Sequence, residues 1–393
     1  MQNRVKHIIR STFDNLVKWR EYLHANPELS FQEHNTSAFV ASRLDEMNIS
    51  YEKGVVGTGI VALIEGRNPE KQCIALRADL DALPIQEENN VSYKSTVDKV
   101  MHACGHDVHT TCLLGAAKAL SDLKNEFEGT IKLIFQPGEE VLPGGASLMI
   151  KEGVLENPKV DKILALHVFP TMDVGKVGFK SGQYMAACDE LYLTIKGKGG
   201  HAALPHQYNN PIMIMAELLL KLEVYLKSLS TGASPYIFAF GNLQADGATN
   251  VIPEYAKAEG TLRTMDEDWR TLVHQKLSVF VDEFLKSKNA EGELEIRKGY
   301  PFLQNDESFT NSSMQEAKGF LGSDNVEEMK IRMTAEDFSY YSQQVPACFF
   351  RLGIRNEDLG IVHGVHHAQF DIDKNALEVG AGIMAYLAIK ALD

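Results

Sequence analysis

Hydrophobic residues near the N-terminus recur at helical spacing, whereas those farther along form short apolar runs. The spacing from Val5 to Leu23 predicts an amphipathic helix that ends near Asn26-Pro27. A second helix is expected from Thr36 to Met47, followed by a strand with glycine interruptions from Val55 to Glu65. The chain therefore begins with two helices and then enters a sheet.

Apolar strands then end repeatedly in polar residues, with a helix between them at about 112–120. The strands and the polar segments that follow them are Cys73–Leu76 before Arg77–Pro84, Thr130–Phe135 before Gln136–Glu140, and Lys162–Leu166 before His167. This alternation predicts an α/β domain with a central, mostly parallel sheet flanked by helices. Open sheets of this kind bind ligands beyond the carboxyl ends of their strands, so these polar residues are candidate site residues.

The pattern changes after Ser181. Four strands and two helices are expected in this part, at 191–195, 211–229 (helix), 236–240, 255–263, 269–286 (helix) and 293–297. They predict an α+β sandwich inserted into the first domain. The chain then returns with a helix after Asn311, a strand at Cys348–Leu352 and a helix from Ala376. The expected domains are residues 1–181 with 300–393, and an insert of residues 182–299.

Composition and charge narrow the class of protein. A chain of 393 residues is too long for one hydrophobic core, which agrees with two domains. The net charge of −14 argues against nucleic acid and anionic membranes as partners. The five cysteines are scattered, the N-terminus lacks the apolar core of a signal peptide, and no segment could span a bilayer. We expect a reduced, cytoplasmic protein.

The nine residues Met101–His109 combine a thiol, three imidazoles and a carboxylate. Cys104 and His106 flank Gly105, so a turning backbone could direct both toward one ion. The alternative is that these side chains are satisfied inside a hydrophobic core. So many polar groups in so short a segment favour a functional site.

Other candidates are weaker when taken alone. Glu139 and Glu140 would point in opposite directions on an extended backbone, so one could bind metal while the other acts as a base. Asp79 and Asp81 follow a buried strand, but a solvated turn is an equal alternative. His167, like His366 and His367, could also be a structural histidine.

Together, Cys104, His106, Glu140, His167 and a C-terminal histidine offer more ligands than one structural tetrahedral zinc needs. The set suits two ions with open coordination positions. Mixed sulfur, nitrogen and oxygen ligands favour Zn²⁺, Mn²⁺, Ni²⁺ or Co²⁺ over Ca²⁺ or Mg²⁺.

Six segments, in order along almost the whole chain, form recognisable motifs: Arg20–His24, Pro27–Ser30, Arg77–Pro84, Met101–Asp107, Phe135–Glu140 and Gly199–Ala203. Together they resemble the amidohydrolase branch of the dinuclear aminoacylase/carboxypeptidase metallopeptidases. That branch includes hippurate hydrolases, N-acyl-amino-acid amidohydrolases, N-acetyl-diaminopimelate deacetylases and auxin-conjugate hydrolases.

The resemblance implies a catalytic domain with two metal ions and an inserted lid domain through which subunits dimerise, with a dimer of dimers as a further assembly. By position, the metal ligands are Cys104, His106, Glu140, His167 and His366, and Glu139 is the general base. His366 is preferred to His367 because it stands four residues before Phe370, which begins a Phe-Asp-x-Asp segment.

The same resemblance assigns residues around this metal set. His201 would reach the neighbouring subunit's site and polarise the scissile carbonyl, and Asn250 and Arg263 would bind substrate. Asp79 and Asp81 would support the metal ligands from behind.

The resemblance therefore implies metal-dependent hydrolysis of the amide bond of N-acyl amino acids or short peptides. A di- or carboxypeptidase that uses the same dinuclear site is the first alternative. A non-catalytic metal-binding or assembly protein is the second, and the presence of Glu139 beside a full ligand set argues against it.

Overall fold

The computed structural model describes residues 1–232 and 234–393, which divide into two compact units. The first unit contains Met1–Tyr184, Gln304–Ile331 and Asp337–Asp393. The second contains Met185–Leu303 and, in addition, the short segment Arg332–Glu336. None of the helices formed by the described residues combines the length and hydrophobicity that a membrane crossing requires.

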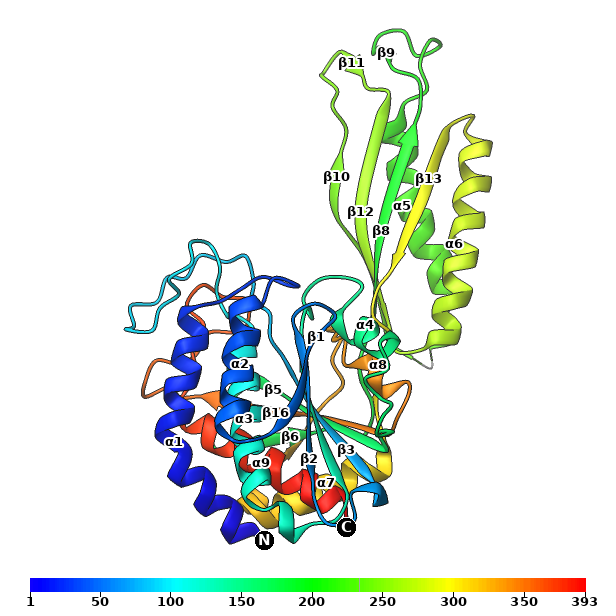
Figure 1. Cartoon of the computed structure of the whole chain (residues 1–393). Helices are drawn as coiled ribbons and strands as arrows, with labels where there is room; N and C mark the ends of the chain where they lie inside the picture. The colour runs from blue at the N-terminus through cyan, green and yellow to red at the C-terminus, as the bar shows by residue number, and fades with distance from the viewer. Residues whose placement is uncertain (233) are drawn as a thin grey trace. The chain divides into compact units, whose positions relative to one another are not determined.

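The first unit is built around an eight-stranded sheet (Figure 1). Its strands are β1 (Ser50–Val55), β2 (Gly59–Glu65), β3 (Cys73–Asp79), β4 (Thr130–Gln136), β5 (Lys162–Asp173), β6 (Val177–Phe179), β15 (Val326–Glu328) and β16 (Ala347–Arg355). The order across the sheet is β1-β2-β4-β3-β5-β16-β6-β15, and β4, β3, β5 and β16 are parallel. The predicted α/β fold with a mostly parallel sheet is confirmed.

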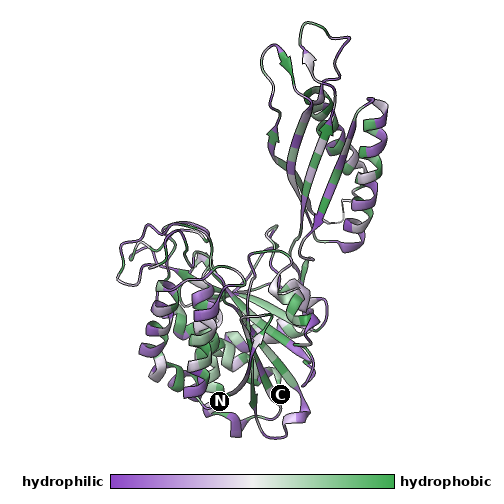
Figure 2. Cartoon of the chain, turned by 45° about the horizontal axis from the view of Figure 1, so that its top comes forward, coloured by the Kyte–Doolittle hydropathy of each residue, from purple (hydrophilic) through white to green (hydrophobic). Residues whose placement is uncertain are grey.

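Helices cover this sheet. They are α1 (Gln2–Ala25), α2 (His34–Glu46), α3 (His106–Asp122), α4 (Gly145–Lys151), α7 (Glu307–Leu321), α8 (Ser339–Ser342) and α9 (Asn375–Ala391), with 3-10 turns at Pro69–Lys71, Lys124–Glu126 and Ser323–Asn325. Helix α3 packs against α1, α9 and β3, and almost all of its residues are buried. The hydrophobic strands of the sheet form the core beneath these helices (Figure 2). The polar residues at the start of α3 are thereby held against the sheet.

Two predicted strands have different bounds in the structure. The strand expected at Val55–Glu65 begins only at Gly59, as β2, because Val56 and Gly57 both have positive φ and turn the chain. This turn joins β2 to β1, a strand that was not predicted. β5 continues past His167, because the residues that follow pair with β16. His167 therefore lies within a strand rather than at its end.

The second unit is an antiparallel four-stranded sheet with two helices. The sheet contains β8 (Ala187–Lys196), β10 (Tyr236–Gln244), β12 (Tyr255–Thr264) and β13 (Glu291–Lys298), and the helices are α5 (Pro211–Leu229) and α6 (Glu267–Ser287). In this unit β9 (Gly200–His201) also pairs with β11 (Val251–Ile252). Another short pair, β7 (Gly182–Met185) with β14 (Leu303–Asn305), lies mostly in residues of the first unit. Alternate residues of β8 are buried, so one face of the sheet packs against the helices.

Candidate metal centre

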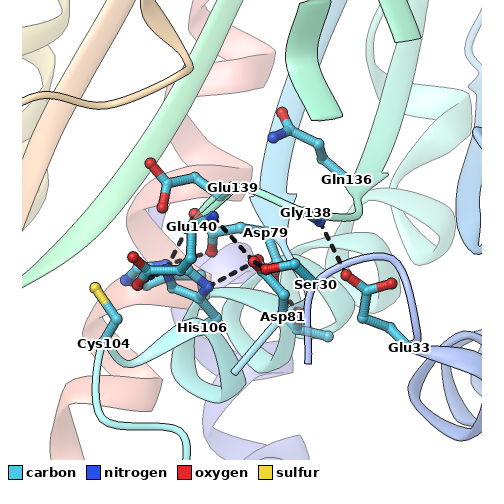
Figure 3. A network of polar contacts seen from close by, with 12 residues as sticks. Ser30, Glu33, Asp79, Asp81, Cys104, His106, Gln136, Gly138, Glu139 and Glu140 are labelled. Atoms are coloured by element: carbon cyan, nitrogen blue, oxygen red, sulfur yellow. Dashed lines mark hydrogen bonds and ion pairs between the residues drawn. The ribbon is translucent and has the colours of Figure 1, made fainter. Parts of the chain in front are cut away.

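Residues from four separate segments of the first unit meet in one polar cluster. Cys104 precedes α3, His106 is the first residue of that helix, and Glu140 follows β4. His167 comes from β5, and His366 comes from the loop between β16 and α9. Figure 3 shows Cys104, His106 and Glu140 directed toward one another.

The ligand atoms form two groups that share one sulfur. Cys104, His106 and His167 make one group, and Cys104, Glu140 and His366 make the other, with all ligand atoms of a group within 4.8 Å of one another. The Cys104 Sγ lies 3.5 Å from His167 Nε2, and His366 Nε2 lies 3.5 Å from Glu140 Oε1. A thiolate at Cys104 could therefore contact two ions.

Gly105 is needed for this arrangement. Its φ of 85° is unfavourable for residues with a Cβ, and a Cβ there would lie 2.6 Å from Val168 Cγ2. The turn separates Cys104 from the first helical residue, His106. The sequence prediction that a turn lets both side chains approach one ion agrees with this geometry.

Two buried polar atoms in the cluster are suited to bind a cation. His106 Nε2 and Glu140 Oε1 are buried and have no hydrogen-bond partner among the described residues. An unpaired buried polar atom typically costs about 1–3 kcal/mol. A divalent ion would satisfy both atoms, and the donor set of sulfur, nitrogen and oxygen fits the transition metals named above. The residues therefore fit a dinuclear centre.

Protons partly balance the negative charge of the cluster. Burial disfavours the imidazolium of His106, but the neighbouring Asp79 and Cys104 outweigh it and raise the pKa of His106 well above its ordinary value. Contacts with Cys104 and Glu140 raise the pKa of His366 to about 10. Burial raises the pKa of the Cys104 thiol. A metal ion that binds these atoms would displace such protons.

The geometry separates His366 from His367. His366 lies against Cys104 and Glu140, and its backbone N–H donates to the Ala103 carbonyl at 2.7 Å. The ring of His367 instead stacks on His363, with 4.3 Å between centroids. Only His366 of this pair belongs to a ligand group in the described part of the chain, as the sequence resemblance implied.

Asp81 orients His106. Its Oδ1 lies 3.2 Å from His106 Nδ1, so a proton on Nδ1 leaves Nε2 free for an ion. Its Oδ2 accepts hydrogen bonds from Ser30 Oγ at 2.6 Å and from the Glu140 N–H at 3.0 Å (Figure 3). One carboxylate thus links two of the candidate ligands.

Asp79, the last residue of β3, is completely buried. Its Oδ2 accepts from Arg77 Nη1 at 2.6 Å and lies 3.8 Å from His106 Nε2, while its Oδ1 lies 2.6 Å from His109 Nδ1. Burial opposes ionisation, but His106 and Arg77 outweigh it and hold the pKa of Asp79 well below its usual range. The solvated-turn alternative for this segment is therefore wrong.

Glu139 and Glu140 lie on a bend rather than on extended backbone. A carboxylate oxygen of each lies within 4.8 Å of the other and of His106, so the two side chains do not point in opposite directions as expected. Glu139 is nearly buried, with 7% of its surface exposed. The Asp337 N–H donates to its Oε1 at 3.4 Å.

Glu33 holds this bend, although it was not among the predicted site residues. Its Oε1 accepts hydrogen bonds from the N–H groups of Gly138 and Phe31 at 2.9 and 2.8 Å, and its Oε2 accepts from Thr58 Oγ1 at 2.6 Å. Gly138 has a φ of 63°, and a Cβ there would lie 2.3 Å from the Phe31 ring. Glu33 stands three residues beyond the Pro27–Ser30 motif, which was its only local signal.

Asp337 was also missed. Its carboxylate accepts from Gln136 Nε2 at 2.9 and 2.8 Å, from Arg77 Nη2 at 2.7 Å and from the Ala146 N–H at 2.9 Å. Gln136 and Asp337 are 201 positions apart, so no local pattern joins them. The contacts connect Asp337 to the strand that precedes Glu139.

The remaining predicted site residues lie in the second unit. His201 is exposed on β9 and pairs in the backbone with Val251, beside the exposed Asn250. The His201 Nδ1 accepts the Ala203 N–H at 3.1 Å. Arg263 is half-buried on β12 and donates to Thr261 Oγ1. The structure thus brings His201 and Asn250 together and places Arg263 on a different strand.

This chain is similar to known proteins in both sequence and structure. Residues 75–390 match the sequence model described as Peptidase family M20/M25/M40. The chain is 37% identical over 307 residues to the N-acyl-L-amino acid amidohydrolase of Geobacillus stearothermophilus, which covers 78% of this chain and 82% of the relative. It is 35% identical over 390 residues to thermostable carboxypeptidase 2 of Saccharolobus solfataricus, covering 98% of each.

A solved structure is similar over nearly the full length. The Bacillus subtilis YXEP protein, described as a dinuclear metal-binding peptidase from the M20 family, has a TM-score of 0.84 and 32% identity. The alignment covers 98% of this chain and 99% of that chain. Because the family model matches most of the chain and full-length relatives exceed 30% identity, the chain belongs to peptidase family M20/M25/M40.

Proposed function

We propose that this M20 hydrolase cleaves the amide bond of N-acyl amino acids. The observation that carries the proposal is a nearly buried carboxylate, Glu139, beside two ligand groups that share Cys104. An amide is a poor electrophile, so hydrolysis needs both an activated water and stabilisation of the developing oxyanion. A site for storing metal ions would need no base.

In the proposed reaction, each group at the metal centre has a separate role. Bound divalent ions supply Lewis-acid chemistry and acidify water. Glu139 accepts the proton of the attacking water and returns it to the leaving amine, a role typically worth about 10²–10⁴-fold in rate. The hydrogen bond from the Asp337 N–H orients the carboxylate of Glu139. Asp81 keeps the proton of His106 on Nδ1, away from the cluster.

The second unit would bind and polarise the substrate. Since Nδ1 of His201 accepts the Ala203 N–H, the neutral ring carries its proton on Nε2, where it can donate to the scissile carbonyl. Arg263 suits a free carboxylate, because its guanidinium donates two parallel hydrogen bonds. The side-chain amide of Asn250 would form a further hydrogen bond with the substrate.

A peptidase acting at the same site is the second candidate, and the similarity to thermostable carboxypeptidase 2 favours it. The two activities differ only in whether the acyl group is itself an amino acid. N-acetyl, N-benzoyl and dipeptide substrates with matched side chains, assayed with Mn²⁺ and with Zn²⁺, separate them. We expect the highest kcat/KM on an N-acyl amino acid, and a clear preference for dipeptides would contradict the proposal.

Removal of metal should abolish activity, because the proposed nucleophile depends on the ions. After prolonged incubation with a chelator and dialysis, activity is expected to fall to background and to return on addition of Mn²⁺, Zn²⁺ or Co²⁺. Metal content measured on the same samples shows whether the ions were removed. Full activity in metal-free protein would exclude the metal-dependent scheme.

We also propose a homodimer formed through the second unit. Helix α5 exposes several large apolar side chains, among them Leu220 and Val224, which are 69% and 71% exposed. Together with Tyr225, Phe280 and Phe284 they line an apolar hollow of about 780 Å³ between α5 and α6. An exposed apolar surface of this kind is typical of a protein–protein interface. The net charge of −14 argues against nucleic acid as the partner.

The dimer gives His201 a testable role in the partner's site. His201→Ala is expected to lose activity and to keep its metals, since it lies outside the ligand groups. When mixed with Glu139→Gln under subunit exchange, it should regain activity, because one site of the heterodimer then has both an intact Glu139 and an intact His201. Verified heterodimers without recovery, from folded and dimeric variants, would show that His201 does not act across the interface.

The five cysteines are free, which supports a reducing compartment. We therefore propose that the enzyme acts in the cytoplasm, on small acylated amino acids rather than on surfaces or polymers.

A further inference from the structure

His109 belongs to the nine-residue segment that begins at Met101, yet the proposed mechanism gives it no role. It lies in the first turns of α3 and is 1% exposed. Its Nδ1 is 2.6 Å from Asp79 Oδ1, and its Nε2 accepts the backbone N–H of Val168 at 2.9 Å. Both ring nitrogens are therefore engaged, one by a carboxylate and one by a peptide group.

These two contacts define the tautomer of His109. An amide N–H can only donate, so Nε2 of His109 must carry a lone pair. The proton of the neutral ring then resides on Nδ1 and is donated to Asp79. If the ring were protonated, the Nε2–H of His109 would face the N–H of Val168, and two donors cannot form a hydrogen bond with each other. The surroundings thus hold His109 as a neutral imidazole with one orientation.

The Val168 peptide joins His109 to a candidate ligand. The Val168 carbonyl lies 2.8 Å from Nδ1 of His167 and accepts its proton. The other ring nitrogen, His167 Nε2, is then unprotonated and lies 3.5 Å from the Cys104 sulfur. His109 thus fixes the backbone at Val168 by accepting the Val168 N–H. The Val168 carbonyl in turn orients the His167 ring.

We propose that His109 is a positioning residue for His167, acting through the Val168 peptide, and that it tunes one of the two metal positions. The proposal rests on the proposed dinuclear site. His167 belongs to the group with Cys104 and His106, and not to the group with Glu140 and His366. Within the described residues, His109 forms no hydrogen bond or ion pair with Glu140 or His366.

A positioning role for His109 predicts weaker binding of one ion only, whereas a general structural role would weaken the binding of both. His109→Leu removes both hydrogen bonds while filling the space. The variant is expected to lose affinity for one ion by about 10–100-fold, the usual cost of removing a group that orients a metal ligand. After dialysis against a weak chelator it should keep one ion per chain where the unaltered protein keeps two.

Two further variants sharpen the test. His109→Gln can still accept the Val168 N–H, so its loss of affinity should be smaller than that of His109→Leu. His102→Leu is the matched control, because His102 is equally buried in the same segment and neither ring nitrogen has a hydrogen-bond partner among the described residues. This control should keep both ions.

The metal-free protein gives an independent readout. Nitrogen-15 NMR of labelled histidines should show a neutral Nδ1–H signal that is missing from His109→Leu, while thermal unfolding reports whether each variant folds. An Nε2–H or charged His109, or unchanged affinity for both ions in His109→Leu, overturns the proposal and leaves the proposed function standing. If the unaltered protein binds no metal, the proposed function falls with it.

Discussion

Glu139→Gln is expected to lower kcat by about 10²–10⁴-fold and to keep both metal ions. The amide of glutamine is nearly the same size and can still accept the Asp337 N–H, so the bend after β4 should be preserved. It cannot accept a proton from water, and the catalytic step therefore loses its base. Metal analysis and steady-state kinetics on one preparation test both parts of the expectation.

A charge-matched control strengthens this test. Glu88→Gln makes the same chemical change at an exposed side chain and should retain full activity. Near-normal kcat in Glu139→Gln would remove Glu139 from the role of base. Loss of metal from Glu139→Gln would instead show that Glu139 is a metal ligand, because its carboxylate lies close to the ligand atoms of His106 and Glu140.

Cys104→Ala is expected to lose both ions and with them all activity. Cys104 belongs both to the ligand group with His167 and to the group with His366. Its removal therefore deprives each ion of the thiolate ligand. His167→Ala and His366→Ala each affect a single group and should each keep one ion. Metal content per chain, measured after dialysis, gives these three results directly.

Cys112→Ala is the matched control for this prediction. Cys112 is a buried thiol of the same helix region and belongs to no ligand group among the described residues. It should keep two ions, although the small cavity will lower stability. Unchanged metal content in Cys104→Ala would show that this thiol is structural.

Much of the fold follows from local patterns. The spacing of apolar residues located α5 at Pro211–Leu229, the bounds that the structure shows. Continuous apolar runs marked β3 and β4, because a strand buried on both faces requires them. The hairpin of β1 and β2 was not predicted. Val56 takes a positive φ that a β-branched residue rarely adopts, so the turn was placed inside a strand and β1 was missed.

The candidate ligands could also be named from the sequence. Cys104 and His106 stand within three residues, on either side of Gly105. Residue types at strand ends and near the C-terminus added Glu140, His167 and a C-terminal histidine, and the motif resemblance identified that histidine as His366. These assignments depend on residue type and position along the chain. Both are visible without a structure.

The supporting contacts required the tertiary structure. Glu33 reaches Gly138 across 105 positions, and Arg77 reaches Asp337 across 260. His109 contacts Val168 only because α3 packs beside β5. Periodicity and motifs reflect interactions between residues that are close together in the sequence. The partner of a buried carboxylate or imidazole is set by strand order and helix packing, which only the folded chain defines.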